Sequence, residues 1–370
     1  MPLKVIQFLP SLRGGGVEVG TLELAKALVE DGHESIVVSA GGPMVERLTA
    51  DGSTHVFWDL GKKSPLTFRH IWRLRKWIAA QDAHILHVRS RMPAWLVYLA
   101  WRGLPEGCRP HLVSTMHGLH SVSAYSEIMC RSERLIAVSE TVKQYIAKNY
   151  PQTDMGKVQV INRGVSPEEY PWGYQASAQW QEQWHNEFPE LKGKRLICLP
   201  GRLTRLKGHQ FLLNLMSSLK SQFEDLHAII VGGEDPKRLA YAEELRQKVL
   251  DLGLADKITF CGARSDMREV YSQAAIVLSL SSKPESFGRT STEALSMGVP
   301  VVAFDHGGVG EQLANLFPQG RVPCFDEEVL IKTVTQVLES GTLPIKNTLY
   351  LKEEMLEQTL AVYKELAGRS

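Results

Sequence analysis

Residues 283–308 read KPESFGRTSTEALSMGVPVVAFDHGG, and this stretch decides the predicted fold. Before it, residues 274–282 (AAIVLSLSS) are a short apolar run typical of a buried strand. From Gly288 the apolar spacing predicts a helix that ends at Gly298, and residues 299–304 (VPVVAF) predict a second buried strand. The stretch therefore predicts a strand, loop, helix and strand of an α/β protein.

Two acids lie in this unit. In an α/β unit the loop after a strand lies at the carboxyl edge of the sheet, where the start of the next helix offers free backbone N–H groups to an anion such as a diphosphate. Glu285 in the loop and Glu293 in the helix then flank the anion site, and each carboxylate can accept hydrogen bonds from a vicinal diol. The alternative interpretation is an exposed helix with two solvated acids.

Length and charge restrict the classes of protein that fit. The chain has 370 residues, of which 44% are hydrophobic and 22% charged, and this predicts about two soluble globular domains. The net charge of +1 argues against a nucleic-acid binder that relies on a global positive field. The charge is uneven, since residues 1–165 hold 20 Lys and Arg against 14 Asp and Glu, and the remainder 22 against 27. The first half is the basic one.

Cysteine usage and hydropathy indicate the compartment. The five cysteines are scattered and form no Cys-x-x-Cys, so we expect reduced thiols and no metal site. The first ten residues, MPLKVIQFLP, lack the long apolar region of a signal peptide, and no apolar run reaches the 18 to 20 residues of a membrane span. We expect a cytoplasmic protein that contacts at most the inner face of the cytoplasmic membrane.

The first half alternates apolar strand patterns with helical patterns, which predicts a parallel sheet covered on both faces. The predicted strands span residues 3–10, 34–40, 55–60, 84–88, 111–118, 134–139 and 158–165. After the first strand, Gly14, Gly15 and Gly16 permit close approach of a phosphate or sugar, although by themselves they fit a flexible turn better.

Residues 62–77 combine basic and apolar side chains without any acid. The basic residues are Lys62, Lys63, Arg69, Arg73, Arg75 and Lys76, and the apolar residues are Phe68, Ile71, Trp72, Leu74 and Trp77. The pattern predicts a basic amphipathic helix. It fits a core-packed helix with a solvated face, or docking on an anionic membrane or lipid-linked acceptor, and both can hold at once.

Residues 285–303 resemble the donor-binding signature of retaining GT-B glycosyltransferases of family 4, the group 1 glycosyl transferases. The resemblance is to members of the bacterial envelope or lipopolysaccharide type. Further segments that resemble family motifs are Gly15-Gly16-Val17-Glu18, His117-Gly118, Gly201-Arg202, Lys207-Gly208 and Gly307-Gly308 with Glu311. The chain departs from the pattern at Arg163, which is inserted within the usual Asn-Gly-Val segment, and at residues 313–323, where the usual Asn/Asp-Gly-x-x-Gly turn is missing.

The resemblance implies a GT-B fold, with two facing Rossmann-like domains that each contain a parallel sheet and a C-terminal helix that crosses back to the first domain. The expected boundaries are residues 1–168 for the acceptor domain, 169–192 for a linker, 193–345 for the nucleotide-sugar domain and 346–370 for the returning helix. The active site is expected in the cleft between the domains.

The implied reaction transfers a hexose-type sugar, with retention, from a nucleoside-diphosphate sugar to a hydroxyl of a glycan or lipid-linked acceptor. UDP-sugars are favoured as donors, and lipopolysaccharide core or an envelope polysaccharide as the acceptor. No cofactor or metal is implied, and the chain contains no Asp-x-Asp, the usual metal-carrying element of the other main glycosyltransferase fold.

The resemblance also assigns roles. The catalytic set is His117, Arg202, Lys207 and Glu285. The donor-binding set is Gly15, Gly16, Arg202, Lys207, Glu285, Phe287, Gly288, Arg289, Thr290 and Glu293. The cations and the helix start would stabilise the leaving diphosphate, which accumulates negative charge. Glu285 would bind the donor sugar, Glu293 the ribose, and His117 the sugar near the developing oxocarbenium ion.

Three other functions remain open. A sugar-nucleotide epimerase or a phosphorylase on the same frame would use similar residues, and an epimerase would alter the donor without an acceptor. A non-catalytic nucleotide-sugar-binding protein would bind nucleotide without turnover, although the complete Arg, Lys and Glu set argues against it. Nucleic-acid binding is disfavoured by the net charge and by the absence of a reading motif.

Overall fold

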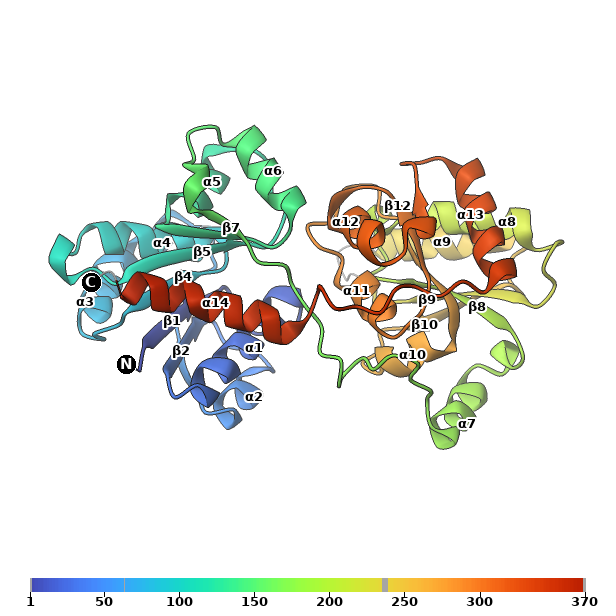
Figure 1. Ribbon diagram of the computed structural model, residues 1–370, viewed down its shortest axis with the longest axis horizontal. Helices are drawn as coiled ribbons and strands as arrows, with labels where there is room; N and C mark the ends of the chain where they lie inside the picture. Colours follow the sequence, from blue (N-terminus) through green and yellow to red (C-terminus); the bar gives the residue numbers. More distant parts are fainter. Residues whose placement is uncertain (1, 63, 235–238, 369–370) are drawn as a thin grey trace. The chain divides into compact units, whose positions relative to one another are not determined.

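The computed structural model describes residues 2–62, 64–234 and 239–368. The chain forms two compact units: unit 1 comprises Met1–Arg163 and Lys352–Ser370, and unit 2 comprises Gly164–Leu351. Each unit contains one parallel sheet and its own helices (Figure 1). These two sheets confirm the predicted α/β fold with two Rossmann-like domains.

The sheet of unit 1 has seven strands in the order β3-β2-β1-β4-β5-β6-β7, and every described pairing in it is parallel. The strands are β1 (Lys4–Phe8), β2 (Glu34–Ser39), β3 (Thr54–Phe57), β4 (Ile85–Val88), β5 (His111–Met116), β6 (Arg134–Ala137) and β7 (Val158–Val160). The order reverses between β1 and β4, the kind of place where ligands bind in open α/β sheets.

The helices of unit 1 include the last helix of the chain. They are α1 (Gly16–Glu30), α2 (Val45–Ala50), α3 (His70–Ala79), α4 (Arg91–Arg102), α5 (Ala124–Glu127), α6 (Glu140–Asn149) and α14 (Lys352–Ala367). Leu360, Val362 and Tyr363 of α14 pack in one core cluster with α1 and the central strands. Figure 1 shows α14 lying across unit 1. The C-terminal helix therefore returns to unit 1, as predicted.

The sheet of unit 2 has six strands in the order β10-β9-β8-β11-β12-β13. The strands are β8 (Arg195–Pro200), β9 (Leu226–Val231), β10 (Ile258–Gly262), β11 (Ala274–Ser279), β12 (Val301–Phe304) and β13 (Arg321–Val322). The helices are α7 (Ala178–Glu187), α8 (His209–Leu219), α9 (Leu239–Asp251), α10 (Met267–Gln273), α11 (Arg289–Ser296), α12 (Gly307–Leu316) and α13 (Glu327–Ser340). The edge strand β13 lies in the segment where the expected family turn is missing.

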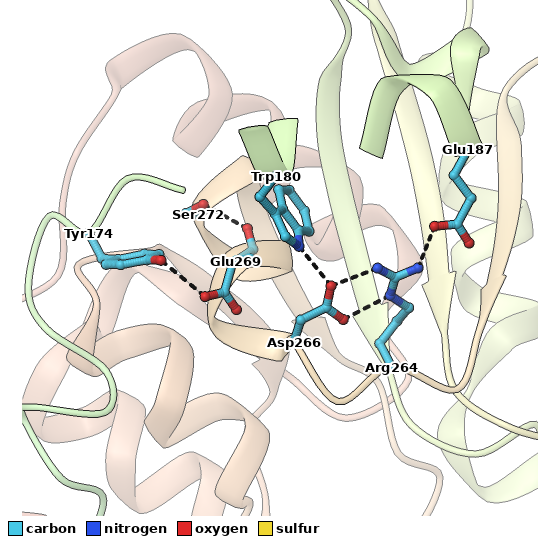
Figure 2. Close-up of polar contacts among 7 residues, drawn as sticks. All are labelled: Tyr174, Trp180, Glu187, Arg264, Asp266, Glu269 and Ser272. Atoms are coloured by element: carbon cyan, nitrogen blue, oxygen red, sulfur yellow. Dashed lines mark hydrogen bonds and ion pairs between the residues drawn. The ribbon is translucent and has the colours of Figure 1, made fainter. Parts of the chain in front are cut away.

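Residues 169–192, which we expected to link the domains, belong to unit 2. Figure 2 shows how this segment is held: Trp180 of α7 donates to Asp266 at 2.8 Å, and Arg264 bridges Asp266 and Glu187. Tyr174 donates to Glu269 at 3.0 Å. The segment is therefore a packed part of the second unit.

The basic segment at residues 62–77 is not the single helix that we predicted. A short 3-10 helix spans Pro65–Arg69, and α3 begins at His70. Proline suits the first position of a helix and cannot continue one, so no helix of the described residues runs from residue 62 through Pro65. Lys63 lies outside the described residues. Trp72 is 68% exposed, whereas Leu74 and Ile78 are buried against the unit. The helices that the structure describes include none with the length and apolar character that a bilayer crossing requires.

Candidate active site

The stretch at residues 283–308 forms the carboxyl edge of the unit 2 sheet, between β11 and β12. Gly288 begins α11 with φ of +93°, and a side chain there would collide with Val309 of α12. The backbone N–H of Gly308 donates to the carbonyl of Glu285 at 2.8 Å, and the Gln312 amide donates to the carbonyl of Phe287 at 2.6 Å. The start of α12 therefore fixes the loop that carries Glu285.

Glu285 is held by two donors. The Lys207 Nζ lies 2.7 Å from Oε1 of Glu285, and the Ser281 hydroxyl donates to the same oxygen at 2.6 Å. Burial alone would raise the pKa of Glu285, but the charge of Lys207 and these hydrogen bonds hold the pKa below its ordinary value. The structure thus brings two predicted site residues from distant segments into one ion pair.

Glu293 has a different environment in the first turns of α11. The residue is 7% exposed, Arg289 Nε donates to Oε1 at 2.9 Å, and the Tyr271 hydroxyl donates to Oε2 at 3.1 Å. Burial raises the pKa of Glu293, although the neighbouring Arg289 acts in the opposite direction. Tyr271 was missed by the sequence reasoning because a tyrosine on a preceding helix carries no motif that connects it to Glu293.

The other donor-binding candidates surround this edge. Arg202 follows β8 and is exposed, and among the described residues it makes no ion pair. Phe287 is buried with its ring edge-on to Tyr350 at 5.8 Å, so it supports the loop from within. Gly288 is buried, while Arg289 and Thr290 in the first turn of α11 are half-buried. A helix start with an exposed cation beside it suits a phosphate group.

The remaining predicted residues lie in unit 1, at the carboxyl edge of its sheet. Gly15 caps the start of α1, and the carbonyl of Gly16 accepts a hydrogen bond from the Arg163 guanidinium. His117 directly follows β5, and both of its ring nitrogens are buried. Burial, followed by the charges of Arg89 and Arg163, holds the pKa of His117 well below its ordinary value, so the imidazole is neutral.

Two parallel-sheet units with polar carboxyl edges define the class of this protein as a two-domain α/β protein of the GT-B type. Family models assign it further: residues 14–169 match the glycosyltransferase family 4 model, and residues 181–353 match the model for glycosyl transferases group 1. The chain belongs to the group 1 glycosyl transferases and is a glycosyltransferase.

Curated relatives agree with this assignment. An uncharacterized glycosyltransferase of Methanocaldococcus jannaschii is 25% identical over 322 residues, which cover 80% of this chain and 78% of the relative. A lipopolysaccharide core biosynthesis mannosyltransferase of Rhizobium leguminosarum bv. viciae is 27% identical over 155 residues, covering 42% of this chain and 44% of that protein.

Solved structures share the fold along the whole chain. A glycosyltransferase from Rickettsia africae ESF-5 superposes with a TM-score of 0.88 at 28% identity, with 100% of both chains covered. The Anabaena protein HepE, solved in complex with UDP and glucose, has a TM-score of 0.76 at 19% identity and covers 98% of this chain and 95% of its own. These likenesses confirm the GT-B fold that the sequence predicted.

Proposed function

We propose that this protein is a retaining, metal-independent glycosyltransferase that moves a hexose-type sugar from a UDP-sugar to a hydroxyl of a glycan or lipid-linked acceptor. The observation that carries the proposal is the pairing of Lys207 with Glu285 beside the start of α11. This arrangement places a cation for a diphosphate and a carboxylate for sugar hydroxyls at one edge of the sheet. The donor is held mainly by unit 2, and the acceptor mainly by unit 1.

Similarity supports the choice of substrates. The Anabaena structure contains UDP and glucose on a fold that matches this chain, which favours a uridine diphosphate sugar as donor. The Rhizobium relative acts in lipopolysaccharide core biosynthesis, which favours an acceptor of the bacterial envelope. The basic first half of the chain suits an acceptor that carries negative charge.

In the proposed reaction the bond between the anomeric carbon and the β-phosphate oxygen breaks, and a new bond forms from the anomeric carbon to the acceptor oxygen. The acceptor proton passes to the leaving phosphate. Arg202 and Lys207 stabilise the charge that builds on the diphosphate, as fixed cations do in a water-poor site. Glu285, held ionised, accepts hydrogen bonds from the sugar. His117 is neutral, so it can donate or accept a hydrogen bond without adding charge.

A donor screen tests this proposal. Nucleotide sugars are first ranked by thermal shift, and the best donor is then incubated with the enzyme, with and without an extracted acceptor pool and with and without EDTA. We expect a UDP-sugar to stabilise the protein, sugar transfer that survives EDTA, and an α-linked product from an α-linked donor by NMR. A donor altered without acceptor would favour an epimerase, and binding without any turnover would favour a non-catalytic protein.

We further propose that the segment at residues 64–77 contacts an anionic membrane or lipid-linked acceptor. Its exposed apolar side chains are Leu66 at 71%, Phe68 at 40% and Trp72 at 68% exposure, and Arg69 and Arg73 are exposed beside them. Basic residues next to exposed aromatic rings are the composition of peripheral membrane contacts.

Vesicle sedimentation tests the membrane contact. Wild-type protein is expected to bind phosphatidylglycerol vesicles and not phosphatidylcholine vesicles, and Trp72→Ser with Arg73→Gln to weaken this binding about tenfold. Leu239→Ser is the matched control, because Leu239 is 55% exposed in unit 2. Equal binding by the control and the double variant would contradict the assignment of this surface.

A further inference from the structure

A pocket in unit 1 combines His117 and Arg163 with residues that belong to no motif. It is lined by the ends of β4, β5, β6 and β7 together with α1 and α14. The polar side chains in its wall are His87, Arg89, Thr115, His117, Arg163 and Thr359. The other lining residues are glycine or apolar, so none of the described residues that line the pocket is acidic. The wall therefore contributes two guanidinium groups and no carboxylate, a composition that favours an anionic ligand.

Arg89 is the buried cation of this pocket. Its side chain belongs to a residue that is only 8% exposed, and Nη1 donates to Oε1 of Gln7 at 2.7 Å. Its Nε is buried and has no hydrogen-bond partner among the described residues. Burial lowers the pKa of Arg89 to about 10, against the weaker opposing effects of Tyr363 and Glu23, neither of which lines the pocket. A buried guanidinium donor without a partner is costly, unless a ligand completes it.

Arg163, which follows β7, also lines this pocket. Its guanidinium lies on the first turns of α1 and donates to the carbonyl of Gly16. A side chain at Gly20 would collide with Arg163, and its Cβ would lie 3.6 Å from Nη2 of Arg89. Glycine inside a helix costs about 1 kcal/mol relative to alanine. Because Gly20 has no side chain, the guanidinium groups of Arg163 and Arg89 can both lie beside this turn of α1.

The floor of the pocket is fixed by hydrogen bonds. His87 contacts the Thr115 hydroxyl through Nε2 at 2.7 Å and the Tyr363 hydroxyl of α14 through Nδ1 at 2.5 Å. Burial and then the charge of Arg89 keep the pKa of His87 well below its ordinary value. The pocket is thus a rigid site in which the histidines are neutral and the arginines carry the charge.

We propose that this pocket binds a phosphate or carboxylate group of the acceptor, so that the enzyme takes an acceptor with an anionic group near the hydroxyl that receives the sugar. The inference rests on the proposed function, in which unit 1 holds the acceptor. Guanidinium groups bind such planar or tetrahedral anions through paired, charge-assisted hydrogen bonds. The donor diphosphate has its own cations, Arg202 and Lys207, in unit 2.

Inorganic phosphate is the probe for the pocket. The melting temperature of the full-length protein is measured against phosphate, with chloride at equal ionic strength as reference. The variants are Arg163→Gln, Gly20→Ala and Lys207→Ala, and Arg47→Gln on α2 is the control, since Arg47 is exposed and does not line the pocket. We expect phosphate to stabilise the wild type, Arg47→Gln and Lys207→Ala alike, and to bind Arg163→Gln and Gly20→Ala about tenfold more weakly.

A shift that disappears in Lys207→Ala and persists in Arg163→Gln would place the anion in unit 2 and overturn the proposal, as would the absence of any shift. Kinetics then separate an acceptor-borne group from a free anion. Added phosphate is expected to raise the acceptor KM of the wild type several-fold and to leave that of Arg163→Gln unchanged; phosphate that binds without competing overturns the acceptor assignment. If the acceptor assignment alone is wrong, Arg163→Gln still binds UDP. If the glycosyltransferase proposal is wrong, the wild type itself does not bind a nucleotide sugar.

Discussion

The carboxyl edges of the two sheets differ in whether their cations have acidic neighbours. In unit 2 two of the site cations have an acid beside them, Lys207 with Glu285 and Arg289 with Glu293, while Arg202 is exposed. In unit 1, Arg89 has the neutral Gln7 as its hydrogen-bond partner, and no described residue in the wall of its pocket is acidic. We call the edge of unit 2 the balanced edge, because its paired cations and acids can be preorganised before any ligand arrives. We call the edge of unit 1 the unbalanced edge, because the charge of a ligand would complete it.

Breaking the balanced edge is expected to have the largest effect. Lys207→Ala removes the cation for the leaving diphosphate and leaves the charge of Glu285 next to it, so we expect kcat to fall about 100- to 1,000-fold. Initial rates with a saturating UDP-sugar measure the loss, and circular dichroism checks that the fold is intact. Lys192→Ala, at an exposed position of the same unit, is the control and should keep normal turnover. Near-normal turnover of Lys207→Ala would remove Lys207 from the site.

Removing charge from the unbalanced edge gives the next largest effect. Arg89→Met is expected to lower kcat/KM for the acceptor about 10- to 100-fold, because a charged hydrogen-bond donor to the ligand is lost. The free energy of unfolding should change by at most about 1 to 2 kcal/mol, since the variant no longer buries a cation but leaves Gln7 without its donor. Urea unfolding and acceptor titrations provide both quantities. A loss of activity that is fully accounted for by the loss of folded protein would indicate a purely structural role for Arg89.

The two acids of the balanced edge should respond to pH with opposite signs. The pKa of Glu285 is lowered on folding, so its contribution to stability is present above the ordinary value of 4.5 and is lost as the pH falls toward the lowered pKa. The pKa of Glu293 is raised on folding, so its stabilising contribution is present below 4.5 and is lost as the pH rises through the raised pKa.

Urea unfolding from about pH 3 to 7 measures both slopes. Relative to the wild type, Glu285→Gln should lose less stability on acidification below 4.5, and Glu293→Gln should lose less stability as the pH rises above 4.5. The contrast between the loop acid, which is paired with Lys207, and the buried helix acid would be contradicted if both variants changed the pH slope of stability in the same direction relative to the wild type.

The smallest effect concerns Tyr271. Tyr271→Phe removes one of the donors to Glu293 and is expected to cost about 1 kcal/mol of stability and to raise the pKa of Glu293 further. Thermal unfolding at neutral pH and the pH slope of the preceding experiment measure these changes. Tyr363→Phe serves as comparison in unit 1, where it should affect stability without moving the titration of Glu293.

Local sequence pattern was sufficient for most of the fold and for the loop that carries Glu285. Apolar runs and glycine breaks are short-range signals, and the motif at Lys207 indicated its partner through family resemblance. The two-residue strand β13 gave no signal because a pairing that short has no periodicity. The 3-10 turn before α3 was missed because the basic and apolar spacing was read across Pro65.

The convergence of Arg89 and Arg163 could not be predicted either. Arg89 follows β4 and Arg163 lies beyond β7, and only the tertiary fold brings both beside Gly20. Arg163 looked like an irregular insertion in the sequence, and Arg89 belonged to no motif. Long-range charge placement depends on the order of strands in the sheet, which alternating apolar patterns do not specify.

The return of α14 to unit 1 has a consequence for synthesis on the ribosome. Unit 2 is a continuous segment of the chain, whereas the core of unit 1 stays incomplete until Leu360, Val362 and Tyr363 have been made. Domains usually fold in the order of their emergence. Here the domain that emerges first is completed last, so the part of its apolar core that α14 covers stays exposed while the second domain is translated.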